Sequence, residues 1–333
     1  MVLLKEDLCK VIEGRGEAAR IPMMHHFWIF PDVYGERKQE VRVILDRYPC
    51  DVDRIYLTMP DVFNAPKDDP GYRLVQKDPP SAHAGLDASP GIGDWAELAG
   101  VLAHFPSPEY PKLVQSVEKT GRYRLAYWYS FLFELLWKLR GMENALTDFY
   151  FYPDEVHKVF GKLTDFFCRA IERAKHEADA DGVFFCDDIG TQKGPFFSLD
   201  MFNEFIKPYY KRIFDCIHSL GMHVWLHTCG NIELFLPGLI EIGVDVIHPI
   251  QKYTMDERRI ANLYGDKICI LAGFDVQQIL PFGTPDDVRA EARFLSDTYR
   301  RSDGRLILTL GNGSTPDWPI ANIEALLDES VRL

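Results

Sequence analysis

The stretch His223-Val-Trp-Leu-His227-Thr-Cys229-Gly230 has the composition of a short buried strand that ends in polar residues. Residues i and i+2 of a strand project from the same side of it. His227 and Cys229 are therefore expected side by side where the strand ends, as two of the ligands that a catalytic Zn²⁺ requires. The alternative is a histidine bonded to a backbone carbonyl beside an inert, packed thiol. A metal site would need a third ligand from elsewhere in the chain.

Similar apolar runs recur along the chain and alternate with amphipathic helical patterns, which is typical of repeated β-α units with a parallel sheet. The eight predicted strands are 21–29, 52–59, 123–129, 182–186, 223–227, 244–248, 268–272 and 305–310. Predicted helices between the later strands are 199–220, 234–242 and 286–301, with a last one starting near Pro319. Eight such units predict an α/β fold, a TIM (β/α)8 barrel in one domain over 1–333.

The segment 64–121 is rich in Pro, Gly and Asp and is too long for an ordinary connection. We expect it to be an insertion between the second and third predicted strands that acts as a lid over one end of the barrel. The pattern indicates no separate second domain.

Composition limits the classes of function. The 333 residues are 47% hydrophobic and 26% charged, as in an ordinary globular domain, and the formal charge of −13 disfavours nucleic acid or an anionic membrane surface as a partner. The N-terminal residues lack the pattern of an export signal, and the seven scattered cysteines form no CxxC pair. We therefore expect a cytoplasmic protein with reduced thiols.

In a TIM barrel, catalytic groups lie at the C-terminal ends of the strands. Polar residues gather at these positions here, and seven of the eight predicted strand ends carry a titratable group. The residues concerned are His25, His26, Asp61, Tyr127, Tyr129, Asp187, Asp188, His227, Cys229, His248, Gln251, Asp275, Gln277 and Asn312. For any single aspartate, capping of the next helix is the alternative role.

Several motifs resemble the uroporphyrinogen decarboxylase superfamily, which contains that decarboxylase and zinc-dependent methyltransferases that act on methanol-type, methylamine-type and methoxylated-aromatic substrates through corrinoid proteins. The resemblance covers the second half of the chain well and the N-terminal half loosely. It is carried by Asp187-Asp188-Ile-Gly-Thr-Gln192, Phe205-Ile-Lys-Pro208-Tyr-Tyr-Lys211, residues 221–230, Gly243-Val-Asp-Val-Ile-His-Pro-Ile-Gln251 and residues 311–323.

Charge argues against the decarboxylase branch, because uroporphyrinogen carries eight carboxylates that need cationic partners. The decarboxylases have an arginine-rich N-terminal loop, whereas the corresponding His25-His26-Phe27-Trp28-Ile29-Phe30-Pro31 has no arginine. Their Gly-His-Gly in the last loop is Gly311-Asn312-Gly313 here. Asp61 could correspond to the aspartate that those enzymes place over the pyrrole nitrogens.

The methyltransferase branch implies that His227 and Cys229 bind zinc, usually with a third ligand, a cysteine, from the last barrel loop. This chain has no cysteine after Cys269, and Asn312 or Ser314 occupies that loop. A replacement could come from Asp187, Asp188, His248 or Asp61, because carboxylates and imidazoles also suit Zn²⁺.

These observations predict a methyltransferase that moves a methyl group from a small methylated or methoxylated donor to a corrinoid held by a separate protein, with zinc as Lewis acid. Relatives also imply a possible homodimer. The predicted catalytic residues are Asp187, Asp188, Asp61 and Tyr127. The predicted substrate-binding residues are His25, His26, Phe27, Trp28, Tyr129, Gln251, Asp275 and Asn312. Phe27, Trp28, Tyr127, Trp128, Tyr129, Phe184 and Phe274 would form an aromatic lining or, alternatively, fill the barrel core.

Two other interpretations stay open at this point. One is a metal-free lyase, such as a decarboxylase of a smaller acid, with Asp61 and Tyr127 as proton donors. The other is a barrel that binds a ligand without turning it over, as the missing third cysteine would allow.

Overall fold

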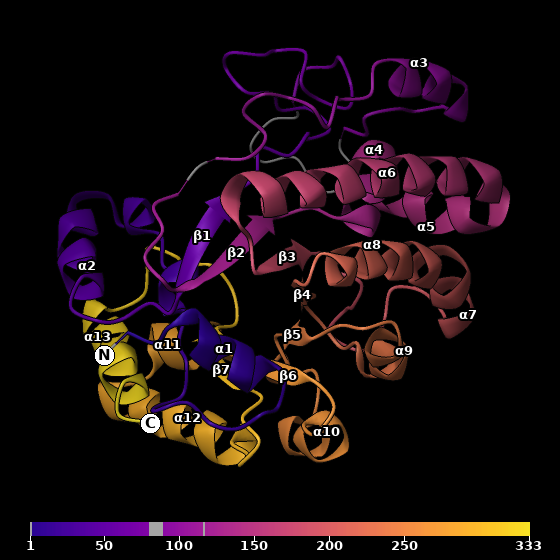
Figure 1. Cartoon of the computed structure of the whole chain (residues 1–333). Helices are drawn as coiled ribbons and strands as arrows, with labels where there is room; N and C mark the ends of the chain where they lie inside the picture. The colour runs from indigo at the N-terminus through magenta and orange to yellow at the C-terminus, as the bar shows by residue number, and fades with distance from the viewer. Residues whose placement is uncertain (1, 80–88, 116) are drawn as a thin grey trace.

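A curled sheet of seven parallel strands forms the centre of the molecule (Figure 1). The computed structural model describes residues 2–79, 89–115 and 117–333. Within them the strands lie in sequence order, each hydrogen-bonded to the next. They are β1 (Val52–Tyr56), β2 (Tyr123–Trp128), β3 (Gly182–Cys186), β4 (His223–His227), β5 (Val246–His248), β6 (Cys269–Phe274) and β7 (Leu306–Leu310). The last seven predicted strands are confirmed, and the fold is barrel-like.

The predicted first strand, 21–29, is wrong. Only Met23 forms a parallel bridge, to Leu308 of β7. Pro22 has no N–H to donate, and the Met23 N–H donates to the Asp51 carboxylate at 2.8 Å instead of to a strand. The chain then turns into a short 3-10 helix at His25–Phe27. The Asp51 N–H donates to the Met23 carbonyl, so this short segment lies between β7 and the residue preceding β1.

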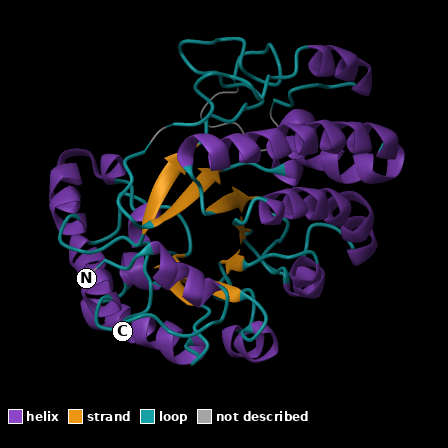
Figure 2. Cartoon of the chain, viewed as in Figure 1, coloured by secondary structure: helices purple, strands orange, loops and turns teal. Residues whose placement is uncertain are grey.

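Helices surround the sheet on its outer side (Figure 2). The predicted helices 234–242, 286–301 and the last one are confirmed, and 199–220 is confirmed as three consecutive helical segments. The helices are α1 (Lys5–Ile12), η1 (His25–Phe27), η2 (Pro31–Arg37), α2 (Lys38–Leu45), η3 (Trp95–Glu97), α3 (Leu98–Ala103), α4 (Leu132–Arg140), α5 (Met142–Phe151), α6 (Pro153–Ala178), α7 (Leu199–Met201), η4 (Phe202–Ile206), α8 (Lys207–Ser219), η5 (Glu233–Phe235), α9 (Leu236–Glu241), α10 (Glu257–Tyr264), α11 (Ile279–Phe282), α12 (Pro285–Tyr299) and α13 (Ile320–Ser330). In the described part of the chain, none of them is both long and apolar enough to cross a membrane.

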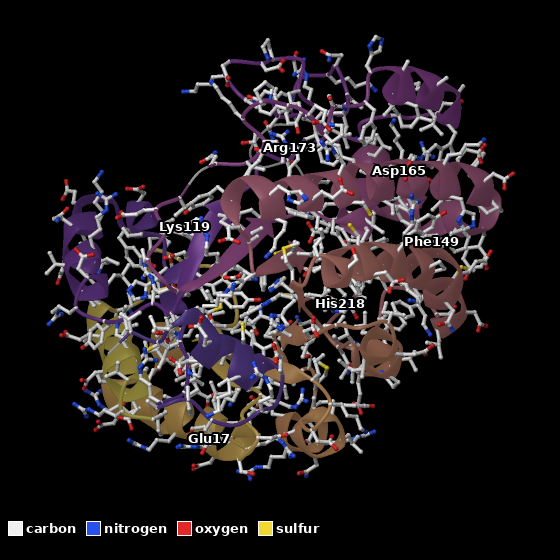
Figure 3. The ribbon with its side chains drawn as sticks, viewed as in Figure 1. Glu17, Lys119, Phe149, Asp165, Arg173 and His218 are labelled. Carbon is white, nitrogen blue, oxygen red and sulfur yellow. The ribbon has the colours of Figure 1, made fainter. Side chains whose placement is uncertain are left out.

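The long connection between β1 and β2 contains α3 and lies beside α4 to α6 (Figure 1). Arg173 of α6 anchors it by donating hydrogen bonds to the carbonyls of Pro108 and Tyr110, at 2.7 and 2.8 Å (Figure 3). Arg140 of α4 donates to the Gly93 carbonyl at 2.8 Å. Residues 80–88 and 116 of the predicted insertion lie outside the described residues. Its role as a lid stays a prediction.

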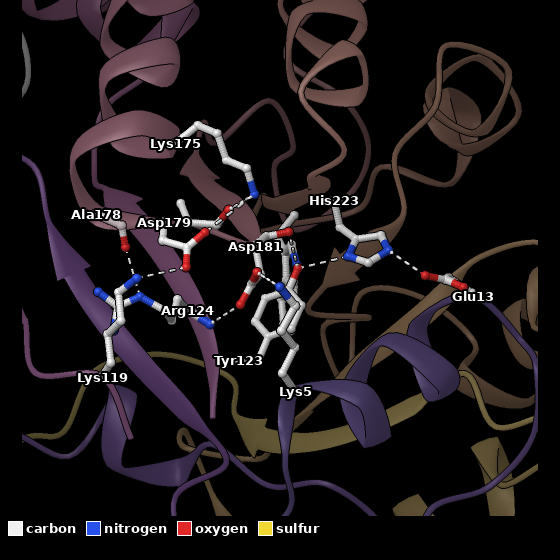
Figure 4. Close-up of polar contacts among 12 residues, drawn as sticks. Lys5, Glu13, Lys119, Tyr123, Arg124, Lys175, Ala178, Asp179, Asp181 and His223 are labelled. Atoms are coloured by element: carbon white, nitrogen blue, oxygen red, sulfur yellow. Dashed lines mark hydrogen bonds and ion pairs between the residues drawn. The ribbon is translucent and has the colours of Figure 1, made fainter. Parts of the chain in front are cut away.

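A polar network closes the N-terminal end of the strands (Figure 4). The Tyr123 hydroxyl donates to the Asp181 carbonyl at 2.8 Å and lies 2.9 Å from His223 Nδ1. The Asp181 carboxylate accepts the Arg124 N–H at 2.9 Å and pairs with Lys5 of α1. Because buried polar groups at this end are partnered, the groups free for chemistry belong at the opposite end.

Candidate active site

A compact group of possible metal ligands lies where β3 and β4 end. Asp188, His227 and Cys229 each offer one ligand atom, and these atoms lie within 4.8 Å of one another. His227 Nε2 is 3.4 Å from Cys229 Sγ and 3.5 Å from Asp188 Oδ1. The Asp188 carboxylate also accepts the Cys229 N–H at 2.8 Å, which fixes the two ends against each other. We call these three residues the cluster.

His248 of β5 determines which nitrogen of His227 faces the cluster. His248 Nε2 lies 2.8 Å from the Leu310 carbonyl, and a carbonyl only accepts, so this nitrogen carries the proton. Burial lowers the pKa of both imidazoles, which are therefore neutral, with one N–H each. His248 Nδ1 is then the acceptor for His227 Nδ1, 2.7 Å away. His227 Nε2 is left with its lone pair toward the cluster, as metal binding requires.

The separations of His227 Nε2 from the other two ligand atoms fit tetrahedral zinc. Bonds of about 2.0–2.3 Å to nitrogen, oxygen and sulfur place neighbouring ligand atoms about 3.4–3.6 Å apart. The separations of His227 Nε2 from Cys229 Sγ and Asp188 Oδ1, 3.4 and 3.5 Å, agree with that range. Burial, with the nearby Asp188 and Glu134 carboxylates, raises the pKa of the Cys229 thiol, so a bound cation would offset unfavourable negative charge here.

Glu134 is a site residue that the sequence analysis missed. It lies in the first turn of α4, and its carboxylate accepts the Asp188 N–H at 3.2 Å. Burial and the charges of Asp187 and Asp188 raise the pKa of Glu134 to about 8. It can therefore hold a proton beside the cluster at neutral pH. The signal in the sequence that could have identified Glu134 was its position in the first turn of the helix that follows a strand end.

A cavity of about 270 Å³ adjoins the cluster. Of the predicted site residues, Asp188, Cys229, Gln251, Asp275 and Asn312 line it. The Asn312 amide lies 3.7 Å from Cys229 Sγ and donates to it, at the place where the resemblance implied a third cysteine. Gln251 accepts the Gly230 N–H at 2.5 Å. Phe274 is the aromatic residue of this lining, which otherwise consists mainly of glycines, amides and carboxylates.

Asp187 and Ser314, two alternatives for the predicted site, are used for structure. Asp187 is fully buried and accepts hydrogen bonds from the Phe133 and Glu134 N–H groups and the Tyr210 hydroxyl, at 3.0, 2.8 and 2.7 Å. It caps α4, and burial raises its pKa to about 6. The Ser314 hydroxyl accepts the Phe30 N–H. Among the candidates for a third ligand, geometry therefore favours Asp188.

The predicted residues of the N-terminal loop separate into two groups. His25 Nε2 lies 2.9 Å from the Ser330 hydroxyl, and His26 Nε2 lies 2.9 Å from the Leu45 carbonyl, so both imidazoles are directed at structural partners. Phe27 and Trp28 are buried in the barrel. Trp28 stacks on His248 with ring centres 5.3 Å apart and lies equally close to His227. Trp28 thus supports the cluster from behind.

Asp61, Tyr127 and Tyr129 line a second cavity, of about 250 Å³, where β1 and β2 end. Within the described residues this cavity shares no lining residue with the first. Most of the predicted aromatic lining lies here or in the core, where Phe184 packs against Tyr127 and Phe27. The predicted catalytic residues are therefore divided between two cavities.

Comparison with known proteins settles the family. Residues 133–332 match the family described as Uroporphyrinogen decarboxylase (URO-D). The chain belongs to this family. The match includes β3 to β7 and all three residues of the cluster, whereas β1 and β2 lie before it.

Among curated relatives, the URO-D chain is 27% identical over 159 residues to the methylcobamide:CoM methyltransferase MtbA of Methanosarcina mazei, covering 48% of this chain and 44% of that protein. It is 24% identical over 155 residues to the methylated-thiol–coenzyme M methyltransferase of the same organism, covering 46% and 40%. The chain thus spans less than half the length of these relatives. A solved methyltransferase structure from Methanosarcina mazei superposes with a TM-score of 0.63 at 16% identity, over 100% of this chain and 99% of that one, which supports the fold.

Proposed function

We propose that this chain is a zinc-dependent methyltransferase that moves a methyl group from a small methylated substrate to a corrinoid held by a separate protein. The observation that carries this proposal is the cluster, in which the Cys229 sulfur and an Asp188 oxygen lie 3.4 and 3.5 Å from His227 Nε2 and all three ligand atoms lie within 4.8 Å of one another. The activities named for the relatives, methyl transfer involving a methylcobamide or methylated thiols with coenzyme M, support this assignment.

Zinc at the cluster would act as a Lewis acid toward the sulfur or oxygen atom that carries the methyl group. Asp188, His227 and Cys229 would hold the metal, and the 270 Å³ cavity beside them would receive the substrate. His248 holds the His227 ring in its orientation. The Asn312 N–H group stabilises negative charge on the Cys229 sulfur.

Glu134 supplies the proton-handling group in this proposal. In the metal-free protein burial and the Asp187 and Asp188 charges raise the pKa of its carboxyl group to about 8, and the carboxyl accepts the Asp188 N–H. In its protonated form Glu134 would deliver a proton toward a leaving thiolate or alkoxide, a step that lowers the barrier to breaking the methyl bond. Asp187 is unsuited to this step, because its oxygens already accept three hydrogen bonds.

The lining of the cavity favours a small polar substrate. Amide and carboxylate side chains from Gln251, Asp275 and Asn312 surround the space beside the cluster, and Phe274 is its aromatic member. A methylated thiol or alcohol suits this environment better than the methoxylated aromatic ring that the sequence suggested. The metal-free lyase alternative relied on Asp61 and Tyr127, which line the other cavity.

Metal content tests the proposal. Protein purified without added metal should contain about one zinc per chain, and Cys229→Ser should lose it. Cys9→Ser is the matched control, because Cys9 lies on α1 at the closed end of the barrel and should keep its zinc. The zinc-loaded protein should also accelerate demethylation of methylcobalamin by a small thiol, the reverse direction of a corrinoid reaction. Zinc-free wild-type protein that cannot be loaded with zinc would refute the mechanism.

A further inference from the structure

The second cavity contains an arginine that forms no ion pair with a carboxylate in the described part of the chain. Arg54 of β1 lines this space together with Tyr127. Its guanidinium lies over the Phe27 ring at 4.0 Å and donates to the Phe27 carbonyl and, at 3.2 Å, to the Tyr56 hydroxyl. Among residues 2–79, 89–115 and 117–333, no carboxylate forms an ion pair with it. Arg54 is half-buried, and its hydrogen-bond acceptors are neutral.

The acid in the same lining does not neutralise Arg54. One oxygen of Asp61 accepts the N–H groups of Phe63 and Asn64, at 3.0 and 3.2 Å. Its other oxygen lies 3.9 Å from Lys138 Nζ. Asp61 therefore accepts hydrogen bonds within its own turn and lies near Lys138 as its cation. The positive charge of Arg54 remains available to the cavity.

The remaining walls are mainly aromatic and apolar. Tyr127 is 4% exposed, and its hydroxyl has no hydrogen bond of normal geometry among the described residues. Burial, followed by Cys186 and Tyr129, raises the pKa of Tyr127. The apolar lining also includes Leu57, Met59, Pro60, Trp128 and Leu135, and Ser130 is a polar member of the wall. A buried hydroxyl without a partner costs free energy unless a further group enters the site. A flat apolar ligand body would fit between such walls.

We propose that this cavity is a second ligand site that binds a small monocarboxylate with a flat, apolar body, with the carboxylate on Arg54. Arginine pairs with carboxylates through parallel hydrogen bonds, and stacking on Phe27 holds its plane in place. Arg54 is the cation in this lining and Asp61 lies nearby, so a singly charged anion is favoured over phosphate, which carries more negative charge. The site goes beyond the proposed methyl transfer, since it involves neither the cluster nor its cavity.

Benzoate is a suitable probe, and isothermal titration calorimetry with the full chain measures its binding. We expect saturable binding of one benzoate, with benzyl alcohol, which has the same ring without the charge, at least about tenfold weaker. Arg54→Gln should weaken benzoate binding about tenfold or more and leave benzyl alcohol unchanged. Arg258→Gln is the matched control, because Arg258 also lies over a ring, that of Phe294, outside this cavity.

Three results would overturn the proposal. They are equal binding of benzoate and benzyl alcohol, undiminished benzoate binding by Arg54→Gln, and displacement of benzoate by inorganic phosphate at similar concentration. The comparison of the two ligands on the wild type holds even if Arg54→Gln folds poorly, which circular dichroism would reveal. Cys229→Ser should still bind benzoate. Failure of the zinc mechanism can therefore be distinguished from failure of the second-site proposal. Loss of benzoate binding in that variant would be a fourth contrary result, because it would place the ligand at the cluster and refute a separate site.

Discussion

His227 and His248 meet through their Nδ1 atoms at 2.7 Å, and this contact leaves the other nitrogen of His227 free for a metal. The proton on His248 is assigned by the Leu310 carbonyl, which can only accept. Two strands and one backbone carbonyl thus set the protonation of the site before any metal binds. The cluster is preorganised through neighbours that are not themselves ligands.

Replacing His248 should therefore weaken zinc binding without removing a ligand. In His248→Phe, His227 Nδ1 loses its acceptor, and we expect the zinc affinity to fall roughly 10- to 100-fold. Competition with a chromogenic chelator measures it. His218→Gln, which removes a histidine paired with Asp245, is the control and should bind zinc as the wild type does. An unchanged affinity in His248→Phe would contradict the proposed role.

The neighbours Asp187 and Asp188 should have opposite phenotypes. Asp188→Asn should lose zinc and change stability little, since an amide oxygen can still accept the Cys229 N–H. Asp187→Asn should keep zinc but lower the free energy of unfolding by about 1–3 kcal/mol, because an amide has one acceptor oxygen for the three buried donors that Asp187 satisfies. Zinc analysis and urea unfolding of both variants check this. The reverse pattern would reassign the third ligand to Asp187.

Glu134 should make the stability of the metal-free protein depend on pH. Its folded pKa is raised from 4.5 to about 8, so below about pH 4.5 both states bind the proton and no penalty arises. As the pH rises toward 8, the unfolded state gains stability by releasing that proton, and the folded state loses stability relative to it. Glu134→Gln should therefore exceed the wild type in unfolding free energy by a margin that grows across this window. Urea unfolding of chelator-treated protein at several pH values measures it, and a constant margin would contradict the raised pKa.

Asp51 should be required to close the barrel. Its buried carboxylate accepts the N–H groups of Leu3 and Met23 at 2.9 and 2.8 Å and pairs with Arg20 at 2.7 Å. Asp51→Ala should cost about 3–5 kcal/mol of unfolding free energy, because it removes the buried carboxylate that pairs with Arg20 and accepts two backbone N–H groups. Asp32→Ala, which breaks an exposed pair with Arg42, should cost less than about 1 kcal/mol. Equal losses would refute the special role of Asp51.

Most of the sheet could be predicted because β2 to β7 are short, mainly apolar runs that are buried almost throughout, whereas β1 contains Asp53 and Arg54 and ends in the exposed Tyr56. The segment 21–29 has the same composition, yet one bridge replaces a strand there. Its backbone groups are taken by the Asp51 carboxylate and by a 3-10 turn, which depend on distant residues. Apolar composition alone does not distinguish a buried strand from another buried segment.

At the site, the spacing of His227 and Cys229 was sufficient to place two side chains together, because both follow from one strand. The third ligand could not be chosen from sequence. Asp187 and Asp188 follow directly after β3, where strand alternation no longer determines the side to which a side chain projects. The Asp187 carboxylate accepts a hydrogen bond from the first turn of α4. Glu134 was missed because its approach depends on how α4 packs against β3 and not on any spacing.

The single bridge between Met23 and Leu308 forms a seam in the barrel, and this seam affects how solvent reaches the candidate site. Amide exchange should be fastest, among the sheet contacts, at this seam, where few hydrogen bonds resist opening. Trp28 follows the seam after one short turn and covers both histidines from behind. Parting of the seam would uncover the rear of the cluster while β3 to β7 stay paired. We infer that solvent reaches the rear of the two histidines on the timescale of this local opening, without unfolding of the sheet.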